Sequence, residues 1–264
     1  MPELAEVEWY RKQWDVGLGE PVTAVRLHAR NRVFRGSDTG ALQSELTGQK
    51  MLGSCTRGKR MLFRFSDDNW LSIHLGMTGK THVEPPEFQP SKHDHLVLLQ
   101  RYRALVFTDS RQFGRVRFSH GRAEPDWWQS DVPEIASRDY NRDVFDWFLS
   151  RHGKAPIKAV LLMQSGFPGI GNWMADEILW RAKIHPARRT GALTAAKRAD
   201  LFRQTKFVVR HSLRTLGKDF SDPPRSWLIH QRWSATGVCP KHRAPLRRAT
   251  IGGRTTAWCP KCQK

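Results

Sequence analysis

The chain has 264 residues, of which 44 are Lys or Arg and 25 are Asp or Glu, so its formal net charge is +19. The length allows two domains with substantial cores, and the basic residues are spread along the whole sequence, which favours a polyanionic partner and nucleic acid first. No stretch reaches the roughly 18 apolar residues of a membrane-spanning helix and the N-terminus lacks a signal-peptide pattern, so we expect a soluble, intracellular protein without a membrane partner.

The N-terminal segment MPELAEVE, residues 1–8, predicts the start of a helix. Proline suits the first turn of a helix, and Glu3 and Glu6 suit the positive end of the helix dipole. A chemical alternative exists, because removal of Met1 would give Pro2 a free secondary amine, which is a nucleophile. Taken alone, the residues favour the ordinary helix start.

Residues from about 22 to 119 show the alternating apolar pattern of β-strands. MLFRF and WLSIHL alternate around the turn SDDN, and HLVLL, ALVFTD and RVRFS have the same character. We therefore expect a β-rich domain of sandwich or barrel type over residues 1–120, with Cys55 as a small buried residue.

The segment GRAEPDWWQSDVPE, residues 121–134, is rich in Pro, Gly and acidic side chains and predicts a linker. Beyond it the apolar spacing becomes helical, and we expect a helical domain over residues 135–234. Its expected helices lie around 144–148, from Pro156 through IKAVLLM, over 173–182, and from an N-cap at Thr194 to a stop at Gly217.

The C-terminus carries the strongest local signal, CPKH at 239–242 and CPKC at 259–262. These pairs can supply tetrahedral zinc with three thiolates and one imidazole, from Cys239, His242, Cys259 and Cys262. Between them, Gly252-Gly253 predicts a tight hairpin turn that would hold Arg254 outward. We expect a zinc finger over residues 235–264 with one structural Zn²⁺; the alternative is free thiols with His242 on the surface.

The glycine-rich SGFPGIGN, residues 165–172, leads into the helix expected at 173–182. Backbone N–H groups, the helix dipole and the Asn172 amide can together bind a phosphate. A helix-helix turn without a ligand fits the spacing equally well, and the net charge of the chain favours DNA.

Three motifs of the β-rich domain place cations or apolar side chains at turns: RGK at 57–59, HLGMTGK at 74–80 and DSRQFG at 109–114. Lys59 stands before a strand, Met77 lies in a glycine-flanked turn, and Arg111 and Phe113 share another turn. Such side chains on loop tips can enter a duplex and fill the gap left by an extruded base. The alternative is that Met77 and Phe113 belong to the core and the cations are solvated.

Together these segments resemble the formamidopyrimidine-DNA glycosylase and endonuclease VIII family. The shared segments, in the family's order, are MPELAEVE, the RGK lysine, HLGMTGK, KHDH at 92–95, DSRQFG, GIGN with IHP, and GGRTTAWCPKCQK. The resemblance implies an α+β protein with an N-terminal β-sandwich domain, a helix-two-turn-helix domain and a zinc finger, with DNA bound in the cleft between the domains. It also implies base excision repair, in which an N-glycosylase step is followed by strand cleavage by β,δ-elimination.

The resemblance also implies catalytic residues. Pro2 would attack C1′ of the damaged nucleotide, Glu3 would act as the acid that assists opening of the sugar ring, and Glu6 and Lys59 would complete the site. An ordinary α-amine has a pKa of about 8, so a neutral fraction exists near pH 7. A secondary amine gives a cationic iminium, which acidifies the C2′ hydrogen and permits phosphate elimination.

By the same resemblance, Lys59, Asn172 and Arg254 would bind phosphates, and Met77, Arg111 and Phe113 would fill the vacated space in the duplex. The full set of expected DNA-binding residues is His74, Met77, His93, Arg111, Phe113, Asn172 and Arg254. The expected partner is double-stranded DNA with damaged bases or abasic sites, bound by a monomer in the bacterial cytoplasm at the nucleoid.

The chain departs from the family pattern at three places: Ala5 replaces a proline, His242 replaces a cysteine, and residues 217–237 replace a lesion-capping loop of the 8-oxoguanine branch with a shorter, different segment. The N-terminus and the residues at the turns favour oxidised purines. The altered segment keeps formamidopyrimidines, hydantoins, oxidised pyrimidines and bulkier adducts open as substrates.

Two other classes of function fit the composition. One is a DNA-binding zinc protein without catalysis, and the other is an RNA-binding or ribosome-associated zinc protein. The presence of Pro2, Glu3 and Lys59 favours the enzyme, because a protein that only binds has no need of an N-terminal proline.

Overall fold

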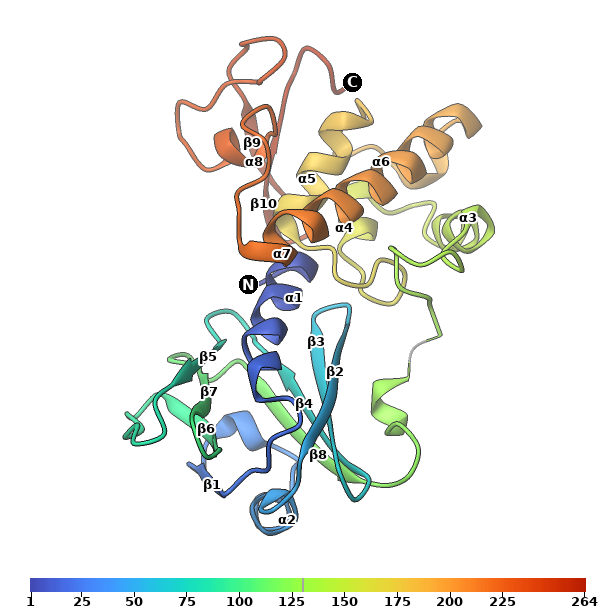
Figure 1. Cartoon of the computed structure of the whole chain (residues 1–264). Helices are drawn as coiled ribbons and strands as arrows, with labels where there is room; N and C mark the ends of the chain where they lie inside the picture. The colour runs from blue at the N-terminus through green and yellow to red at the C-terminus, as the bar shows by residue number, and fades with distance from the viewer. Residues whose placement is uncertain (130) are drawn as a thin grey trace. The chain divides into compact units, whose positions relative to one another are not determined.

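The computed structural model describes residues 1–129 and 131–264. Contacts divide it into two units. The first contains Met1–Pro2 and Glu6–Gln129, and the second contains Glu3–Ala5 and the described chain after residue 130 (Figure 1). The linker expected at 121–134 includes Ser130, which lies outside the described residues, and the finer division into four segments stays a prediction.

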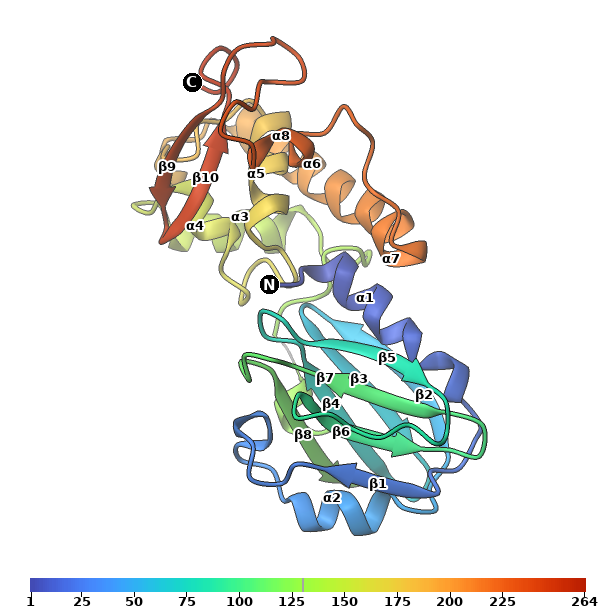
Figure 2. The same ribbon diagram turned by 90° about the vertical axis from the view of Figure 1, so that its left-hand side faces the viewer.

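The N-terminal unit is a sandwich of two antiparallel four-stranded sheets (Figure 2). One sheet has the order β1-β6-β7-β5, with β1 Ala24–Leu27, β6 Asp94–Leu99, β7 Ala104–Thr108 and β5 Lys80–Glu84. The other has the order β2-β3-β4-β8, with β2 Met51–Arg57, β3 Arg60–Phe65, β4 Asn69–His74 and β8 Arg115–His120. Alternate side chains of both sheets, such as Phe63 of β3 and Phe107 of β7, meet in one core. The expected β-sandwich is therefore confirmed.

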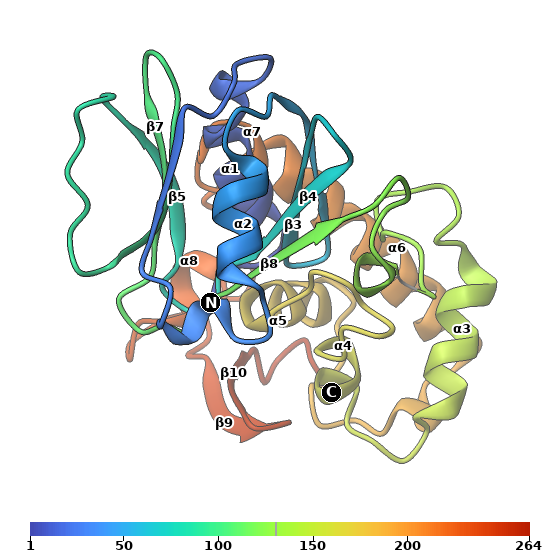
Figure 3. The same ribbon diagram turned by 90° about the horizontal axis from the view of Figure 1, so that it is seen from below.

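Two helices accompany the sandwich, α1 Leu4–Gln13 and α2 Thr39–Leu46. The Asp38 side chain caps α2 by accepting hydrogen bonds from the amides of Gly40 and Ala41. Helix α2 contacts β1 of one sheet (Figure 2) and β8 of the other (Figure 3). It therefore covers one end of the sandwich.

The sequence predicted the turn between β3 and β4 correctly and the burial of Cys55 wrongly. Asp67 and Asp68 form that turn with φ of 52° and 56°, the left-handed values that a tight two-residue hairpin needs. Cys55 is exposed. It belongs to β2, which is an edge strand of its sheet, and the position of a strand within a sheet is not visible in the composition of the strand.

The C-terminal unit is helical and ends in a two-stranded hairpin. Its helices are α3 Arg142–Arg151, α4 Ile157–Leu161, α5 Asn172–Arg181, α6 Ala195–Arg214, α7 Leu216–Asp219 and α8 Ile229–Arg232, and its strands are β9 Arg247–Ile251 and β10 Arg254–Trp258. Helix α5 packs against α6 and against β10 (Figure 2), and most of its residues are buried. It is the central element of this unit.

The long helix α6 begins as expected and ends earlier than expected. The Thr194 hydroxyl accepts a hydrogen bond from the Lys197 amide, which is the expected N-cap. The helix breaks at Thr215, and Gly217 lies inside the next helix, α7. Helix α7 ends at Phe220, a C-cap residue in the left-handed conformation with φ of 62°. Among the described residues, no helix combines the length and the hydropathy needed to cross a lipid bilayer.

Candidate active site and nucleic-acid interface

The Glu3 carboxylate caps the N-terminus of α5. It accepts hydrogen bonds from the amides of Gly171 at 3.0 Å, Trp173 at 2.9 Å and Met174 at 3.1 Å. Amides at a helix N-terminus lack partners within the helix, and the positive end of the helix dipole stabilises a carboxylate there. The sequence allows these N–H groups either to bind a phosphate or to lie in a turn without a ligand, and in the structure they bind the Glu3 carboxylate.

The glycines before α5 make room for the N-terminal residues. A Cβ atom on Gly171 would lie 2.2 Å from Glu3 Cδ, and one on Gly169 would lie 2.7 Å from Leu4 Cβ. The Leu4 amide also donates a hydrogen bond to the Gly169 carbonyl at 3.0 Å. The GIG sequence therefore admits Glu3 and Leu4 against the backbone. Pro2 is half-buried and directly precedes this fixed carboxylate.

Asn172 and the finger hairpin meet at one carbonyl. The Asn172 Nδ2 atom donates a hydrogen bond to the Thr255 carbonyl at 2.9 Å, and Thr255 follows Arg254 on β10. The turn Gly252-Gly253 has φ of 61° and 72° and closes the hairpin as predicted. A Cβ on Gly252 would lie 2.8 Å from Ala159 Cβ of α4, so the turn packs closely on that helix. Asn172 and the exposed Arg254 are thus brought to neighbouring positions.

A cluster of buried charged side chains contacts the Asn172 backbone, and sequence reasoning did not identify it. Asp176 Oδ1 accepts a hydrogen bond from Lys158 Nζ at 2.5 Å, and Asp176 Oδ2 accepts from Arg232 Nη2 at 2.6 Å. Lys158 Nζ also donates to the Asn172 carbonyl at 2.7 Å, and the Ala257 amide of β10 donates to Asp176 Oδ2 at 3.2 Å. All three charged side chains are buried, and desolvation lowers the pKa of Lys158.

This cluster connects four elements of the C-terminal unit. Lys158 lies on α4, Asp176 on α5, Arg232 on α8, and Asp176 binds the backbone of β10. An uncompensated buried charge is costly, so the three residues hold these elements in one arrangement. The signal in the sequence is the acidic pair in WMADEILW, which interrupts an otherwise apolar helix.

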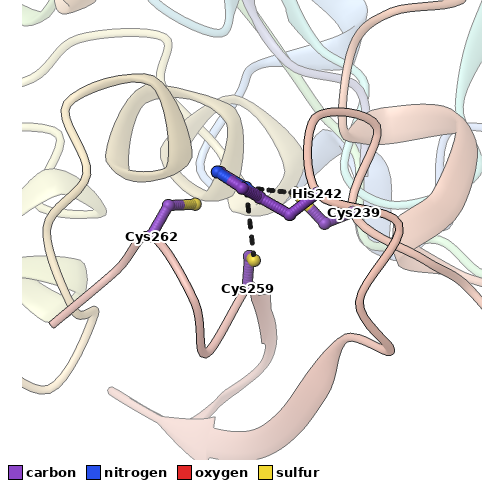
Figure 4. A group of neighbouring side chains, drawn as sticks. All are labelled: Cys239, His242, Cys259 and Cys262. Carbon is purple, nitrogen blue, oxygen red and sulfur yellow. Dashed lines mark hydrogen bonds between the residues drawn. The ribbon is translucent and has the colours of Figure 1, made fainter.

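Four side chains near the C-terminus converge on one point (Figure 4). The ligand atoms of Cys239, His242, Cys259 and Cys262 all lie within 4.8 Å of one another. His242 Nδ1 lies 3.5 Å from Cys239 Sγ and 3.9 Å from Cys259 Sγ. The Trp180 indole N–H donates to Cys239 Sγ at 3.4 Å. The group can hold a metal ion, and α5 supplies a hydrogen bond to one of its ligands.

In the N-terminal unit, Lys59 lies in the turn between β2 and β3, next to His74. The residue after Lys59, Arg60, is the cross-strand partner of His74. Desolvation, followed by the positive charges of Lys59, Arg35 and Arg60, lowers the pKa of His74 to about 4. The imidazole is therefore neutral at pH 7, and its Nδ1 accepts a hydrogen bond from the Gly76 amide at 3.1 Å.

The turns that carry Met77 and Phe113 lie side by side. Met77 is 40% exposed and Phe113 is 41% exposed, so neither belongs to the core. The Arg111 guanidinium lies 4.8 Å from the Phe113 ring centroid. A Cβ on Gly76 would lie 2.4 Å from the Phe113 carbonyl carbon, which shows how closely the two turns pack. The structure thus brings Met77, Arg111 and Phe113 together at one surface.

Asp109 organises these two turns, and sequence reasoning did not assign it. Its side chain is fully buried. Thr78 Oγ1 donates a hydrogen bond to Asp109 Oδ1 at 2.6 Å, and the Gly114 amide donates to Asp109 Oδ2 at 2.7 Å. The Asp109 amide in turn donates to the carbonyl of His93, which is half-buried. The aspartate in DSRQFG was the signal, because an acidic residue before a turn commonly binds nearby amides.

Within the segment 217–237, Trp227 and Leu228 are anchored to α5 and α6. Trp227 is 2% exposed, and the Arg181 guanidinium lies 4.5 Å from its ring and 4.8 Å from the ring of Phe207. Glu177 accepts hydrogen bonds from the Leu228 amide and from Arg181, both at 2.7 Å. Burial raises the pKa of Glu177 to about 7.

Comparison with known proteins finds matches for both units of the chain. Residues 1–116 match the model of the formamidopyrimidine-DNA glycosylase N-terminal domain, and residues 133–222 match that of the formamidopyrimidine-DNA glycosylase H2TH domain. The formamidopyrimidine-DNA glycosylases of Solibacter usitatus and Roseiflexus sp. are 32% and 33% identical to the chain, and each alignment covers 100% of both proteins.

Solved structures extend the similarity to three dimensions. Lactococcus lactis Fpg, in a complex with DNA containing N7-benzyl-Fapy-dG, is 27% identical over 100% of both chains, with a TM-score of 0.88. The same protein in a complex with DNA containing an abasic site is 27% identical over 99% of both chains, also with a TM-score of 0.88. With both units and the whole length matched, the chain belongs to the formamidopyrimidine-DNA glycosylase family of base-excision-repair enzymes.

Proposed function

We propose that the protein is a bifunctional DNA glycosylase and AP lyase that removes oxidised bases, foremost purines, through an N-terminal proline Schiff base. The observation that carries this proposal is the fixed position of the Glu3 carboxylate, which is the next residue after Pro2. Three backbone amides and the end of α5 hold it. A proton donor and acceptor is thereby kept beside the proposed nucleophile.

The proposed reaction begins when the Pro2 nitrogen, freed by removal of Met1, attacks C1′ of the damaged nucleotide. The N–C1′ bond forms, the bond from C1′ to the base breaks, and the base leaves with its electron pair and takes a proton from water. The Glu3 carboxylate accepts the proton that the Pro2 nitrogen loses and passes it to the ring oxygen O4′ as the C1′–O4′ bond opens, which leaves an iminium between Pro2 and C1′. Loss of the C2′ proton expels the 3′ phosphate, a second elimination expels the 5′ phosphate, and water releases the enzyme.

We propose damaged double-stranded DNA as the partner. A net charge of +19 supplies the field that attracts phosphates. Asn172 and Arg254 come from neighbouring positions of the C-terminal unit, where the Thr255 carbonyl and the Gly252-Gly253 turn hold them. Lys59 is the phosphate ligand that we assign to the N-terminal unit. Such contacts position the DNA without reading its sequence, and that suits a search for damage.

Met77, Arg111 and Phe113 are proposed to enter the duplex where the damaged nucleotide leaves it. Their exposure and their adjacent turns support this role. We assign His74 and His93, from the same edge of the sandwich, to contacts with the DNA backbone, His74 as a neutral imidazole. Glu6, in the first turn of α1, is assigned to support of the catalytic residues.

We propose that the Cys239, His242, Cys259 and Cys262 group binds one Zn²⁺. Zn–S bonds of about 2.3 Å and Zn–N bonds of about 2.0 Å place tetrahedral ligands roughly 3.5–3.8 Å apart. The distances of 3.5 and 3.9 Å from His242 Nδ1 to two of the sulfurs agree with that spacing. The ion would have a structural role, because three thiolates and an imidazole complete its coordination. Its ligands flank the hairpin that carries Arg254.

The preferred lesion is a narrower proposal. The attachment of Trp227 and Leu228 to α5 supports a segment that differs from the lesion-capping loop of the 8-oxoguanine branch. Formamidopyrimidines are therefore the first candidates. Hydantoins, oxidised pyrimidines and bulkier adducts are the alternatives.

The test is borohydride trapping with protein that begins at Pro2. The substrates are duplexes with an abasic site, 8-oxoguanine, a formamidopyrimidine or dihydrothymine. A covalent adduct forms only if an amine of the protein has made an imine with the sugar. We expect the adduct on the N-terminal peptide, and its loss when residues are added before Met1. A tag of the same length at the C-terminus is the matched control.

Each other outcome changes the assignment. Full activity of the verified N-terminally extended protein would reject Pro2 as the nucleophile. Trapping on the abasic site alone would identify a lyase whose base lesion lies outside the panel. Tight DNA binding without any adduct would favour a DNA-binding zinc protein without catalysis. Tighter binding of RNA than of DNA would favour an RNA-binding or ribosome-associated zinc protein.

A further inference from the structure

The turn that carries Lys59 is closed by two arginines. Arg57 and Arg60 are cross-strand partners at the ends of β2 and β3. Gly58 precedes Lys59 in the turn with φ of 58°, and glycine at the first central position with positive φ is typical of a type II′ hairpin. The orientation of Lys59 therefore depends on how the two arginines are held.

Trp128 binds both arginines. The guanidinium of Arg57 lies 5.4 Å and that of Arg60 lies 5.1 Å from the Trp128 ring centroid. Arg57 Nη1 and Arg60 Nη2 donate hydrogen bonds to the Trp128 carbonyl at 3.0 and 3.2 Å. Arg60 Nη1 also donates to the Trp127 carbonyl. We call Arg57, Arg60 and Trp128 the arginine clamp.

The clamp rests on the outer face of the sheet β2-β3-β4-β8. Trp128 is 1% exposed and packs with Leu62 of β3 and Trp70 of β4. The Trp70 indole N–H donates to the Gly121 carbonyl at 2.7 Å. The segment from Gly121 to Trp128, which follows β8, is thus fixed to the sheet at both of its ends.

The arginine clamp also offsets the repulsion among the cations of this turn. Arg57, Lys59 and Arg60 place three cations at one turn, and Lys59 is only 8% exposed. Arg60 is also the cross-strand partner of His74 on β4, so the cations of this turn lie beside that strand. Contact of a guanidinium with an indole face is favourable, so Trp128 stabilises the two arginines that flank Lys59 in this turn.

We propose that Trp128 is a positioning residue for Lys59, acting through Arg57 and Arg60. The proposal rests on the proposed role of Lys59 as a phosphate ligand of the damaged nucleotide. It assigns a function to a tryptophan that follows the β-sandwich strands in sequence and binds the arginines on both sides of the Lys59 turn. Replacement of Trp128 releases the turn, so it impairs the reaction only while Lys59 is present.

The experiment is a double-mutant cycle with Trp128→Leu and Lys59→Ala, measured as single-turnover cleavage of an abasic-site duplex. Because displacement of a catalytic group by about 1 Å can cost 10²-fold, we expect Trp128→Leu to slow cleavage about 10- to 100-fold. The double variant is expected to be no slower than Lys59→Ala, because the two residues act as one unit. Trp127→Leu is the matched control: it removes a ring that stacks on Arg117 and keeps the carbonyl, so we expect the wild-type rate.

Thermal unfolding of each variant separates positioning from folding. If Trp128→Leu unfolds, Arg57→Lys takes its place in the cycle, since it keeps the charge and loses the planar contact with Trp128. An unchanged cleavage rate in Trp128→Leu would overturn the proposal. So would a double variant whose rate is reduced by the product of the two single reductions, because that shows that the two residues act independently. If the wild-type protein does not cleave the duplex, the result counts against the proposed function instead. The arginine clamp is then tested by the same double-mutant cycle, with the Kd for a duplex that carries an uncleavable abasic analogue as the measured quantity.

Discussion

The carboxylate of Glu3 and the amide of Gly171 lie 3.0 Å apart, although 167 residues separate them in the chain. The contact is possible because Gly171 has no Cβ, which would lie 2.2 Å from Glu3 Cδ. With the bonds from Trp173 and Met174, this hydrogen bond fixes Glu3 to the N-terminus of the central helix of the C-terminal unit.

Gly171→Ala is expected to displace Glu3. The new methyl group overlaps the carboxylate, so we expect a loss of about 1–3 kcal/mol in the free energy of unfolding and a larger relative loss in single-turnover cleavage. Gly153→Ala is the matched control, because a Cβ there meets its nearest neighbour at 3.7 Å. Urea unfolding and single-turnover kinetics measure the two effects, and equal behaviour of both variants would contradict the steric argument.

Asp176→Asn is expected to destabilise the protein and weaken DNA binding. Loss of the buried negative charge leaves Lys158 and Arg232 uncompensated, which costs about 3–5 kcal/mol. Asp200→Asn removes one partner of an exposed ion pair with Arg203, and we expect a change of about 0–1 kcal/mol. Chemical denaturation gives the stabilities, and titration of an abasic duplex gives the Kd. A wild-type Kd in folded Asp176→Asn would show that the cluster does not hold Asn172 and Arg254 in place.

Replacement of a ligand in the Cys/His cluster is expected to release zinc. Cys259→Ser should lower the zinc content measured by elemental analysis and weaken DNA binding, because the hairpin with Arg254 loses its support. His242→Cys should keep the metal, since a thiolate is an equally good ligand. Cys55→Ser is the control, as Cys55 is exposed and lies outside the cluster. Unchanged zinc content in Cys259→Ser would reject the site.

Stability is expected to depend on pH through Glu177. Burial raises its pKa from 4.5 to about 7, so between these values the folded protein holds a proton that the unfolded chain has released. The stability that this group contributes is present below pH 4.5 and is lost as pH rises through 7, by on the order of 1–3 kcal/mol. Glu177→Gln keeps an acceptor for the Leu228 amide and removes the titration.

The measurement for Glu177 is the difference in unfolding free energy between wild type and Glu177→Gln from pH 4.5 to 7.5. The comparison with Glu177→Gln is needed because the titration of His74 changes the unfolding free energy in the opposite direction. Its lowered pKa of about 4 makes stability rise as pH increases from 4 to 6.5. We expect the wild type to lose stability relative to the variant with rising pH. Parallel curves would show that Glu177 titrates normally.

The sequence predicted the features that depend on neighbouring residues. The turn at Asp67-Asp68, the cap at Thr194, the turn at Gly252-Gly253 and the Cys/His cluster all follow from local residue types and spacing. The sandwich could be expected because strand alternation is a local pattern.

The features that the sequence did not predict depend on distant partners. The exposure of Cys55 follows from the position of β2 at a sheet edge, and the capping of α5 by Glu3 joins the N-terminus to a helix in the second half of the chain. Lys158, Asp176 and Arg232 come from three helices, and nothing in any one helix shows that their charges meet. Such contacts are set by packing of the tertiary structure, which spacing along one segment does not encode.

The membership of Glu3–Ala5 in the C-terminal unit means that the two units cannot be separated by cutting the chain once. A fragment that starts after residue 130 would lack the cap of α5 and two residues of its own core, Leu4 and Ala5. During synthesis, the first five residues leave the ribosome long before residues 171–174 exist. Glu3, the neighbour of the proposed nucleophile Pro2, therefore becomes fixed only when the C-terminal unit folds, so a truncated product carries Pro2 without its fixed neighbour.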